Sequence, residues 1–334
     1  MCGIAGFILT DPQRTTAAMT RLATAMGDTL VHRGPDAGDT WVDAARGVGF
    51  SHRRLSIVEL SPAGAQPMTS ACQTGVLCYN GEIYNRDALR ALAHTTGNAT
   101  TAPFAGAWRG HSDTEALLEV CTRSGPSAAA AASIGMFAYA YLHQTTQQLT
   151  LVRDRLGIKP LFYWQGPEGF AFASQPRALL ALPFVSARAN LNALHVFLRH
   201  AYTPAPHTAF DGIHQLEPGQ TLTINVADPA ALPTITPFWR ADDVVKNARA
   251  EPFNGTDAEA VDALDELIQT AVGDRLMADV PLGAFLSGGI DSSAVVAAMQ
   301  TVSPAKARTF SIGFDVTGYN EADHAQVSGN GPGM

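Results

Sequence analysis

Cysteine is scarce in this sequence. Among its 334 residues there are four cysteines, Cys2, Cys72, Cys78 and Cys121. They show no paired metal-ligand spacing and are too few for a disulfide framework, so the sequence predicts neither a metal site nor a cystine-stabilised fold. The start of the chain also lacks a basic stretch followed by an apolar core, which is the pattern of a secretory signal. We therefore expect a reduced, cytoplasmic protein.

Positive charge and long apolar runs are lacking too. Lysine and arginine number 22 against 30 aspartates and glutamates, which gives a net charge of −8. Nucleic-acid-binding proteins usually present a basic face, and a membrane-spanning helix needs roughly 20 consecutive apolar residues. We therefore expect neither a nucleic acid nor a membrane as a partner. The chain does have a globular composition, 46% apolar and 16% charged, and enough length for two domains.

The first six residues, Met1-Cys2-Gly3-Ile4-Ala5-Gly6, place a thiol directly behind the initiator methionine. If Met1 is removed, Cys2 carries a free α-amino group with an ordinary pKa of roughly 8, and that amine can accept the thiol proton. Cys2 would then be a nucleophile with its own base. The apolar residues 3–9 predict a buried strand that holds it rigidly. The alternative is an ordinary small buried cysteine.

Two further segments have both a structural and a functional interpretation. Arg53 and Arg54 precede the segment 55–58, and arginine there suits bidentate binding of a carboxylate, although a surface pair is the plain alternative. Asn80-Gly81-Glu82 follows a short apolar strand, and Asn-Gly is a typical hairpin turn. A side-chain amide beside the unencumbered N–H of a glycine is also the type of donor pair that stabilises an oxyanion.

The segment Ser112-Asp113-Thr114-Glu115 precedes an apolar helix. A serine N-cap followed three residues later by glutamate is a capping box, and this pattern accounts for Ser112 and Glu115. It leaves Asp113 without a structural role. We therefore expect that an acidic group at this position could hold a substrate ammonium.

The order of predicted elements divides the chain into two domains. Short strands at 136–142, 148–153, 160–164 and 169–173 follow one another closely, which indicates antiparallel pairing. Residues 1 to about 190 thus predict stacked antiparallel sheets covered by helices, an α+β fold. The proline-rich segment 201–256 predicts a linker with one hairpin around 217–226. A second domain begins near 257 with an amphipathic helix.

A strand at 280–286, the turn Ser287-Gly288-Gly289-Ile290-Asp291-Ser292-Ser293, a helix and a strand at 308–314 form a βαβ unit. Backbone N–H groups in such a turn, with a helix N-terminus behind them, make an anion site. The turn is not a Walker motif, because no Lys-Ser/Thr follows the last glycine. The alternative is a tight turn with a serine cap.

These motifs, taken in order, resemble the glutamine-dependent asparagine synthetase family. The resemblance extends from residue 1 to about 325. It rests on Met-Cys-Gly-Ile-Ala-Gly at 1–6, His-Arg-Gly-Pro-Asp at 32–36, Arg-Leu-Ser-Ile-Val at 54–58, Asn-Gly-Glu at 80–82, Ser-Asp-Thr-Glu at 112–115, Gly-Met-Phe-Ala at 135–138, Arg-Asp-Arg-Leu-Gly-Ile-Lys-Pro at 153–160 and Ser-Gly-Gly-Ile-Asp-Ser-Ser at 287–293.

The resemblance implies a class II glutamine amidotransferase domain at 2–200, an αββα sandwich of the N-terminal-nucleophile type, then the linker 201–256. A partial ATP-pyrophosphatase domain, an incomplete α/β nucleotide-binding fold, follows at 257–334. Cys2 would attack the glutamine side-chain amide and release ammonia, with Asn80 and Gly81 holding the oxyanion. Arg54 would bind the α-carboxylate and Asp113 the α-ammonium. The rest of the glutamine pocket would be Leu55, Ser56, Ile57, Val58 and Glu82.

In the second domain, the resemblance implies that ATP, with Mg²⁺, activates the aspartate β-carboxylate as an adenylate that ammonia then attacks. Leu286 and Ile312 would line the adenine site, and the phosphates would lie on Ser287, Gly288, Gly289, Asp291 and Ser292. The implied activity is that of a glutamine-hydrolysing asparagine synthase, with glutamine, aspartate and ATP as substrates, no prosthetic group, and a homodimer as a candidate assembly. The alternatives are a glutaminase without synthesis, an amidotransferase for another carboxylate, and a non-catalytic fragment.

The chain also departs from the family pattern. Family members are much longer, and the second Ser-Gly-Glu loop and the rest of the nucleotide-binding sheet are missing. The tail 327–334 lacks apolar periodicity. We therefore expect a product truncated relative to the family. Gln175-Pro176 stands where the family pattern has an acidic residue, which affects the expected contacts between the domains.

Overall fold

The computed structural model describes residues 1–11, 15–98, 101–314 and 320–329. The chain forms two compact units, Met1–Val244 and Val245–Met334. Residues 330–334 of the expected tail, Tyr319, and residues 99–100 of the segment before Ser112 lie outside the described part. Within the described ranges, no helix combines the length and the apolar character needed to cross a membrane.

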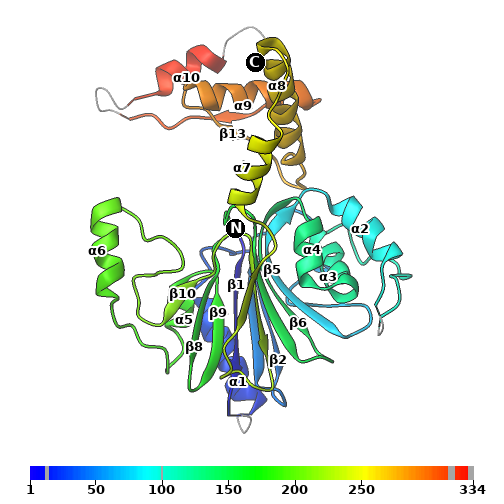
Figure 1. Ribbon diagram of the computed structural model, residues 1–334, viewed down its shortest axis with the longest axis vertical. Coiled ribbons are helices and arrows are strands. Elements are labelled where there is room, and N and C mark those ends of the chain that lie inside the picture. Colours follow the sequence, from blue (N-terminus) through cyan, green and yellow to red (C-terminus); the bar gives the residue numbers. More distant parts are fainter. Residues whose placement is uncertain (12–14, 99–100, 315–319, 330–334) are drawn as a thin grey trace. The chain divides into compact units, whose positions relative to one another are not determined.

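Two six-stranded antiparallel sheets form the centre of the first unit (Figure 1). The first has the order β10-β8-β9-β1-β3-β2 and consists of β1 (Gly3–Leu9), β2 (Ala37–Asp43), β3 (Val48–Arg54), β8 (Phe162–Gly166), β9 (Gly169–Ala173) and β10 (Ile213–Gln215). The second has the order β12-β11-β7-β6-β5-β4 and consists of β4 (Met68–Thr69), β5 (Gly75–Ile83), β6 (Gly135–His143), β7 (Gln148–Arg153), β11 (Gln220–Asn225) and β12 (Thr234–Pro237).

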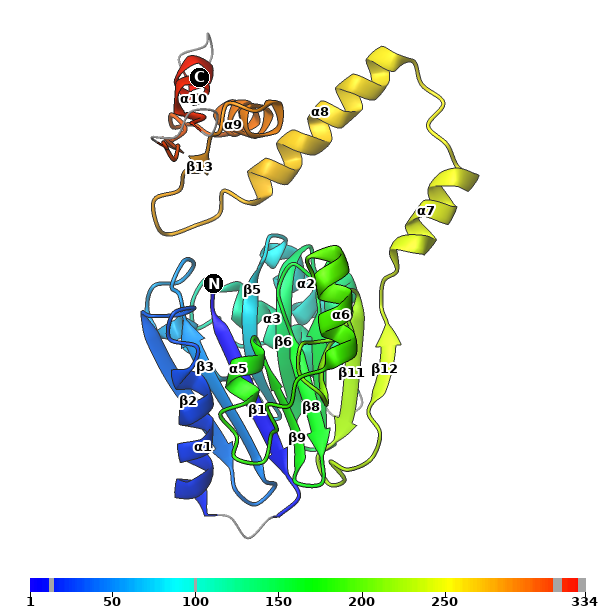
Figure 2. The ribbon, with the colours of Figure 1, turned by 90° about the vertical axis from the view of Figure 1, so that its left-hand side faces the viewer.

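Helices cover the outer face of each sheet, which makes four layers (Figures 1 and 2). Buried side chains of α1 (Thr16–Asp28) and α5 (Pro176–Leu179) pack on the first sheet. Those of α2 (Arg86–Thr95), α3 (Asp113–Ser124) and α4 (Pro126–Ala132) pack on the second. A third apolar cluster fills the space between the sheets. The predicted αββα sandwich is therefore confirmed.

Strand β1 shows how the sequence builds these layers. It lies between β3 and β9 and is buried along its whole length. Because side chains alternate along a strand, Ile4 and Ile8 enter the core between the sheets, whereas Ala5, Phe7 and Leu9 face α1. Gly6 permits close packing, since a Cβ there would lie 2.6 Å from the Phe172 ring. The nucleophile candidate Cys2 thus directly precedes a central, immobile strand.

The structure differs from the predicted linker 201–256. Three segments in it pair with strands of the sandwich: β10 with β8, β11 with β7, and β12 with β11. β10 and β12 are short, so their pairing depends on distant neighbours, whereas β11 also places Leu222 and Ile224 in the core between the sheets. The first unit extends to Val244, and α7 (Ala241–Ala250) follows β12. Helix α6 (Leu191–His200) also belongs to this unit.

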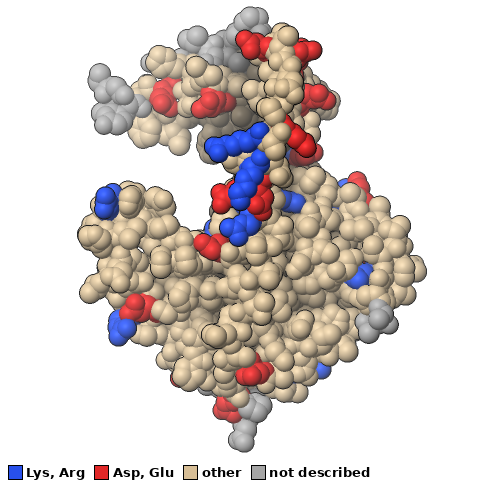
Figure 3. Space-filling view, viewed as in Figure 1, with Lys and Arg blue, Asp and Glu red and all other residues tan. Residues whose placement is uncertain are grey.

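On the face drawn in Figure 3, charged side chains of the first unit are scattered singly or in pairs of opposite sign. Arg188 and Asp211 of this unit form a salt bridge, 2.6 Å long. Among the described residues, the face shown therefore has no large patch of one sign.

The second unit contains a short parallel pair of strands, β13 (Ala284–Phe285) and β14 (Thr309–Phe310), joined by α9 (Ile290–Val302). Its other helices are α8 (Asp257–Asp274) and α10 (Ala322–Gly329). Helix α8 begins with a complete capping box, Thr256 with Glu259. The predicted βαβ order is present, but the strands are shorter than predicted. A parallel sheet is normally buried on both faces, whereas Phe285 and Phe310 are largely exposed here.

Candidate active site

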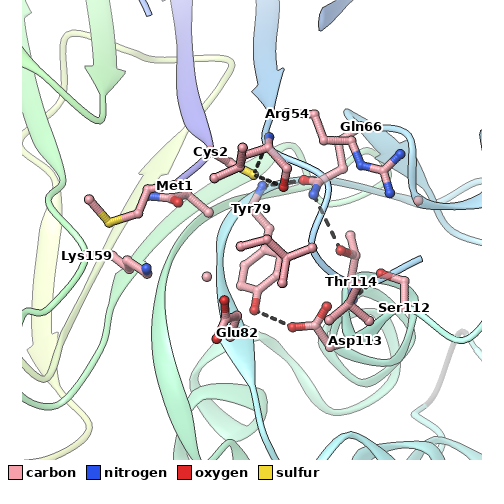
Figure 4. A pocket seen from close by; sticks show the side chains of 16 residues that line it. Met1, Cys2, Arg54, Gln66, Tyr79, Glu82, Ser112, Asp113, Thr114 and Lys159 are labelled. Carbon is pink, nitrogen blue, oxygen red and sulfur yellow. Dashed lines mark hydrogen bonds between the residues drawn. The ribbon is translucent and has the colours of Figure 1, made fainter. Parts of the chain in front are cut away.

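A cavity lies where the start of β1, the end of β3 and the edge of β5 meet the first turn of α3 (Figure 4). Ten residues were predicted for the glutamine site, and all of them except Ser56 line this cavity. Ser56 lines a neighbouring cavity instead, because its backbone N–H donates to the Asp36 carboxylate at 2.7 Å. The fold therefore brings together segments that lie more than 100 residues apart.

The Cys2 thiol is positioned by the backbone of Leu55. The Leu55 N–H donates to Sγ at 3.4 Å, and the thiol lies 3.7 Å from the Leu55 carbonyl oxygen. Burial raises the pKa of the Cys2 thiol, and the Leu55 N–H offsets only part of that effect. Since the thiol is not acidified by its surroundings, it needs a base to become the reactive thiolate.

Two cationic side chains lie near the N-terminal amine. Arg33 donates from Nε to the Cys2 carbonyl at 3.0 Å, and the nearly buried Lys159 lines the cavity beside Met1 (Figure 4). Burial lowers the pKa of the Met1 amine, and Lys159 and Arg33 lower it further. A neutral amine can accept a proton, so this environment favours a base next to the thiol.

Asn80 is almost fully buried, and its Nδ2 has no hydrogen-bond partner among the described residues. A buried amide without an acceptor is costly, so such groups mark places where a ligand supplies the missing partner. Asn80 lines the same cavity as Cys2. The arrangement suits donation to an oxygen atom bound there.

The Gly81 N–H lies at the open edge of β5. The N–H of Tyr79 donates to Gln66 Oε1 at 2.7 Å and that of Ile83 to Asp113 Oδ2 at 2.9 Å, both on the edge facing away from β6. Because N–H directions alternate along a strand, Gly81 N–H points to this edge between them. A Cβ at Gly81 would lie 2.4 Å from the Met136 carbonyl oxygen, so a side chain does not fit.

The hairpin turn that Asn-Gly predicts is not formed. Asn80, Gly81 and Glu82 lie inside β5, paired with β6. The interpretation of Asn80 and Gly81 as an oxyanion donor pair agrees with this position, since both residues face one cavity from adjacent places on a rigid strand. The turn propensity is overridden by pairing over the whole length of β6.

Asp113 is the first residue of α3, behind the N-cap Ser112, whose hydroxyl accepts from the Thr114 N–H at 3.0 Å. The predicted capping box is incomplete, because Glu115 instead accepts from the backbone and side chain of Arg109. Burial raises the pKa of the Asp113 carboxyl. Its Oδ2 already accepts from the Tyr79 hydroxyl at 2.6 Å (Figure 4) and from the Ile83 N–H. The carboxylate is therefore held in place at the cavity wall.

Arg54 ends β3 and also lines the cavity. Its guanidinium donates to the Ser61 carbonyl at 3.1 Å and to the Glu59 carbonyl, both on the loop that follows the strand. Gly64 makes room for it, since a Cβ there would lie 2.1 Å from Nη2. The predicted carboxylate ligand is thus fixed by the loop that forms one wall of the cavity.

Several cavity residues were not predicted as site residues: Met1, Gly64, Gln66, Tyr79, Ser112, Thr114 and Lys159. Gln66 connects β5 to α3, because it accepts from Tyr79 and donates to the Thr114 hydroxyl at 3.4 Å. Lys159 lies inside the motif at 153–160, which was the one sequence signal that could have identified it. No local pattern identifies Gln66.

In the second unit, the predicted nucleotide loop lies between β13 and α9. The Ser287 and Ser292 hydroxyls are 3.0 Å apart, and Ser292 donates to the Gly289 carbonyl at 3.1 Å. Gly288 has a φ of +81°, which favours glycine. A separate cavity in this unit is lined by Leu286, Ser287 and Ile312 together with Phe285, Phe310, Ser311, Phe314 and Glu321.

Comparison with known proteins also divides the chain into two regions. The family model described as "Glutamine amidotransferase domain" matches residues 1–239, and the model described as "Asparagine synthase" matches residues 263–328. Asparagine synthetase [glutamine-hydrolyzing] 1 of Bacillus subtilis is 32% identical over 98% of this chain and 48% of its own length. A putative asparagine synthetase [glutamine-hydrolyzing] of Mycobacterium bovis is 35% identical over 98% of this chain and 50% of its own length.

The chain spans about half the length of these curated relatives. The similar solved structures say less about the family of this chain. The allosteric regulatory enzyme of purine biosynthesis, for example, is 13% identical with a TM-score of 0.49, covering 95% of this chain and 67% of its own. The family model over residues 1–239 covers more than half of the sequence. The chain therefore belongs to the family of glutamine amidotransferase domains.

Proposed function

We propose that the first unit hydrolyses glutamine to glutamate and ammonia, with Cys2 as the nucleophile. The observation that carries this proposal is the unpartnered, buried Nδ2 of Asn80 in the cavity that also holds the Cys2 thiol. A thiol and a preformed amide donor at one cavity are what attack on a carboxamide requires. Every residue that lines the cavity belongs to the first unit, so hydrolysis does not depend on the second.

The reaction begins after removal of Met1. The freed α-amine of Cys2 takes the thiol proton, and the thiolate attacks the side-chain carbonyl carbon of glutamine. The electron pair of the C=O bond moves to oxygen, which accepts hydrogen bonds from Asn80 Nδ2 and Gly81 N–H. The C–N bond then breaks, the amine returns its proton to nitrogen, and ammonia leaves a γ-glutamyl thioester. Water, deprotonated by the same amine, hydrolyses the thioester to glutamate and regenerates the thiol.

Substrate recognition follows from the two charged walls of the cavity. Arg54 binds the glutamine α-carboxylate with N–H groups that its loop carbonyls do not use, and Asp113 binds the α-ammonium. Leu55, Ile57, Val58 and Glu82 complete the pocket, whereas Ser56 contributes through the backbone path of its loop. This assignment is supported by the positions of Arg54 and Asp113 in one cavity.

We further propose that the second unit is part of an ATP site for the synthesis of asparagine. Leu286 and Ile312 lie against adenine, and Ser287, Gly288, Gly289, Asp291 and Ser292 lie on the phosphates. Asp291, the acidic residue in the first turn of α9, would help to hold a Mg²⁺ ion bound to the ATP phosphates, and the ion would offset their negative charge. ATP activates the aspartate β-carboxylate as an adenylate, and ammonia displaces AMP.

The proposal also includes a cytoplasmic location and an assembly state. The four cysteines are free thiols, and the nucleophile must stay reduced, which suits the cytoplasm. A homodimer remains the expected assembly, and light scattering of the purified chain tests it. Glutamine hydrolysis without synthesis is the second candidate, favoured by the completeness of the cavity within the first unit.

The test measures ammonia release from glutamine together with the intact mass of the purified chain. We expect steady release by a chain that lacks Met1, and loss of release in Cys2→Ala. Cys72→Ala is the matched control, because Cys72 is exposed and does not line the cavity. Release that survives Cys2→Ala, or that occurs while Met1 is retained, contradicts the mechanism. Formation of AMP with aspartate separates the synthase from the glutaminase alone.

A further inference from the structure

Glu59 has an unusual backbone and a buried side chain. It lies on the loop after β3, with a φ of +59°, in the left-handed region that non-glycine residues seldom adopt. Its side chain is 7% exposed. A strained, buried acid persists only where its surroundings hold it firmly, and such strain is concentrated at functional sites.

The Glu59 carboxylate joins the loop after β3 to the segment just before α3, and both continue into residues that line the glutamine cavity. Oε1 accepts from the Ser61 N–H at 3.3 Å and from the Ser61 hydroxyl, within its own loop. Oε2 accepts from the His111 N–H at 2.9 Å and lies 2.9 Å from His111 Nδ1. Hydrogen bonds from Ser61 and His111 lower the pKa of the Glu59 carboxyl to about 2, so it is ionised at neutral pH.

The backbone of Glu59 contacts Arg54, and its side chain contacts the segment that carries Asp113. Both Arg54 and Asp113 are assigned to substrate binding. The Glu59 backbone carbonyl accepts from the Arg54 guanidinium, which also donates to Ser61. His111 stands two residues before Asp113, and its own carbonyl accepts from Arg86 Nη1 at 2.7 Å. The chain of contacts therefore runs from Arg54 through Glu59 to the segment that carries Asp113.

Gly110 makes this bridge sterically possible. A Cβ at position 110 would lie 2.2 Å from Glu59 Oε2 and 3.0 Å from the Ala63 Cβ. Its φ lies outside the range that requires glycine, so close approach, rather than backbone conformation, is what an alanine there would disturb. The carboxylate fits against the backbone only because position 110 has no side chain.

We propose that Glu59 is a positioning residue that sets the separation of Arg54 and Asp113, and that it thereby makes the site selective for substrates with both an α-carboxylate and an α-ammonium. The proposal rests on the proposed glutamine hydrolysis. Glu59 acts through Arg54 and Asp113 and does not touch the substrate. The α-carboxylate and α-ammonium of an amino acid are bonded to one carbon, so their separation is fixed. Without the bridge, Arg54 and Asp113 no longer match that separation, and recognition of both groups at once is lost.

The test compares two carboxamides, L-glutamine and glutaramate, which has the same chain and carboxylate but no α-amino group. Ammonia release by the full chain is measured for Glu59→Gln and for Gly110→Ala, which displaces the carboxylate without altering Glu59. We expect kcat/KM for L-glutamine to fall roughly ten- to a hundredfold, mainly through KM, the size of a lost charged hydrogen bond. For glutaramate we expect less than about a threefold change, so discrimination between the two falls.

Glu115→Gln is the matched control. Glu115 is also a buried carboxylate near the start of α3, but it binds Arg109 rather than the loop after β3. We expect it to lower the melting temperature and to leave the ratio of the two substrates unchanged. An equal loss for both substrates in Glu59→Gln and Gly110→Ala, or an unchanged ratio, overturns the positioning role. Absence of ammonia release from the unmodified chain overturns the proposed hydrolysis instead.

Discussion

Replacing Asn80 with alanine distinguishes a catalytic role of its side-chain amide from a structural one. Asn80 Nδ2 is buried and has no partner among the described residues, so its removal sacrifices no hydrogen bond of the ligand-free protein. Leaving a buried donor unsatisfied costs about 1–3 kcal/mol, and alanine removes that cost. The loss of one oxyanion donor, in contrast, lowers kcat by roughly 10²–10³, or about 3–4 kcal/mol of transition-state stabilisation. Asn80→Ala should therefore be nearly inactive and no less stable than the unmodified protein.

Asn85 provides the matched control for this experiment. Its Nδ2 donates to the Ala132 carbonyl at 2.9 Å, and its Oδ1 accepts from the Ile134 N–H at 2.8 Å. Asn85→Ala breaks both bonds and should cost about 1–3 kcal/mol of stability, while ammonia release persists. The assays are ammonia release at saturating glutamine and urea unfolding followed by circular dichroism.

The opposite result, lost stability with retained activity, would refute this reasoning. If Asn80→Ala unfolds at clearly lower urea and keeps its kcat within about threefold, the amide serves the fold and not the oxyanion. Asn80→Ala could instead lose activity and also lose as much stability as Asn85→Ala. The role of Asn80 in catalysis would then not be separable from its packing, and the argument from the unpartnered Nδ2 would fail.

The remaining predictions concern packing, burial of charge and the amine. Gly6→Ala should destabilise the first unit by about 1–3 kcal/mol in urea unfolding, because its Cβ would meet the Phe172 ring at 2.6 Å; an unchanged midpoint would show that the ring moves freely. Asp113→Asn should raise KM for glutamine yet stabilise the fold at pH 7, because burial raises the pKa of the Asp113 carboxyl and so disfavours its charged form. The gap in melting temperature should narrow as the pH falls through this raised pKa, and it should close below the ordinary pKa of an aspartate, roughly 4. Lys159→Met should move the acidic limb of kcat/KM to higher pH. Lys159 lowers the pKa of the Met1 amine, and we expect it to act in the same direction on the Cys2 amine that removal of Met1 exposes. Lys159→Arg should retain the profile, and a Lys159→Met profile identical to that of the unmodified protein refutes this role.

The strands of the first unit could be predicted where the pattern is local. The segments at 148–153 and 169–173 coincide with β7 and β9, because buried strands with tight links are marked by apolar runs and turn residues. Strands β10, β11 and β12 could not be predicted as parts of the sheets. Strands β10 and β11 pair with β8 and β7, more than 40 residues earlier, and β12 joins the sheet by pairing with β11.

The candidate site shows the same division. Cys2, Asn80 and Asp113 follow from the chemistry of their side chains, and the cavity contains all three. The engagement of Glu115 with Arg109 instead of its own helix start could not be predicted, because a better-placed donor competes with the capping box. The roles of Gln66 and Glu59 depend on which side chains meet in space, and no periodicity or spacing carries that information.

The central place of β1 has a consequence for biosynthesis. One neighbour of this strand, β3, is complete at Arg54, whereas the other, β9, begins only at Gly169. A nascent chain is synthesised at roughly 5–20 residues per second. On the order of 10 s therefore passes between the synthesis of β3 and that of β9, and until then β1 has only one of its two neighbouring strands. During that interval an aminopeptidase can reach the starter methionine on an unfolded end. Maturation of the nucleophile would then precede closure of the sandwich, and translation speed would set the time allowed for it.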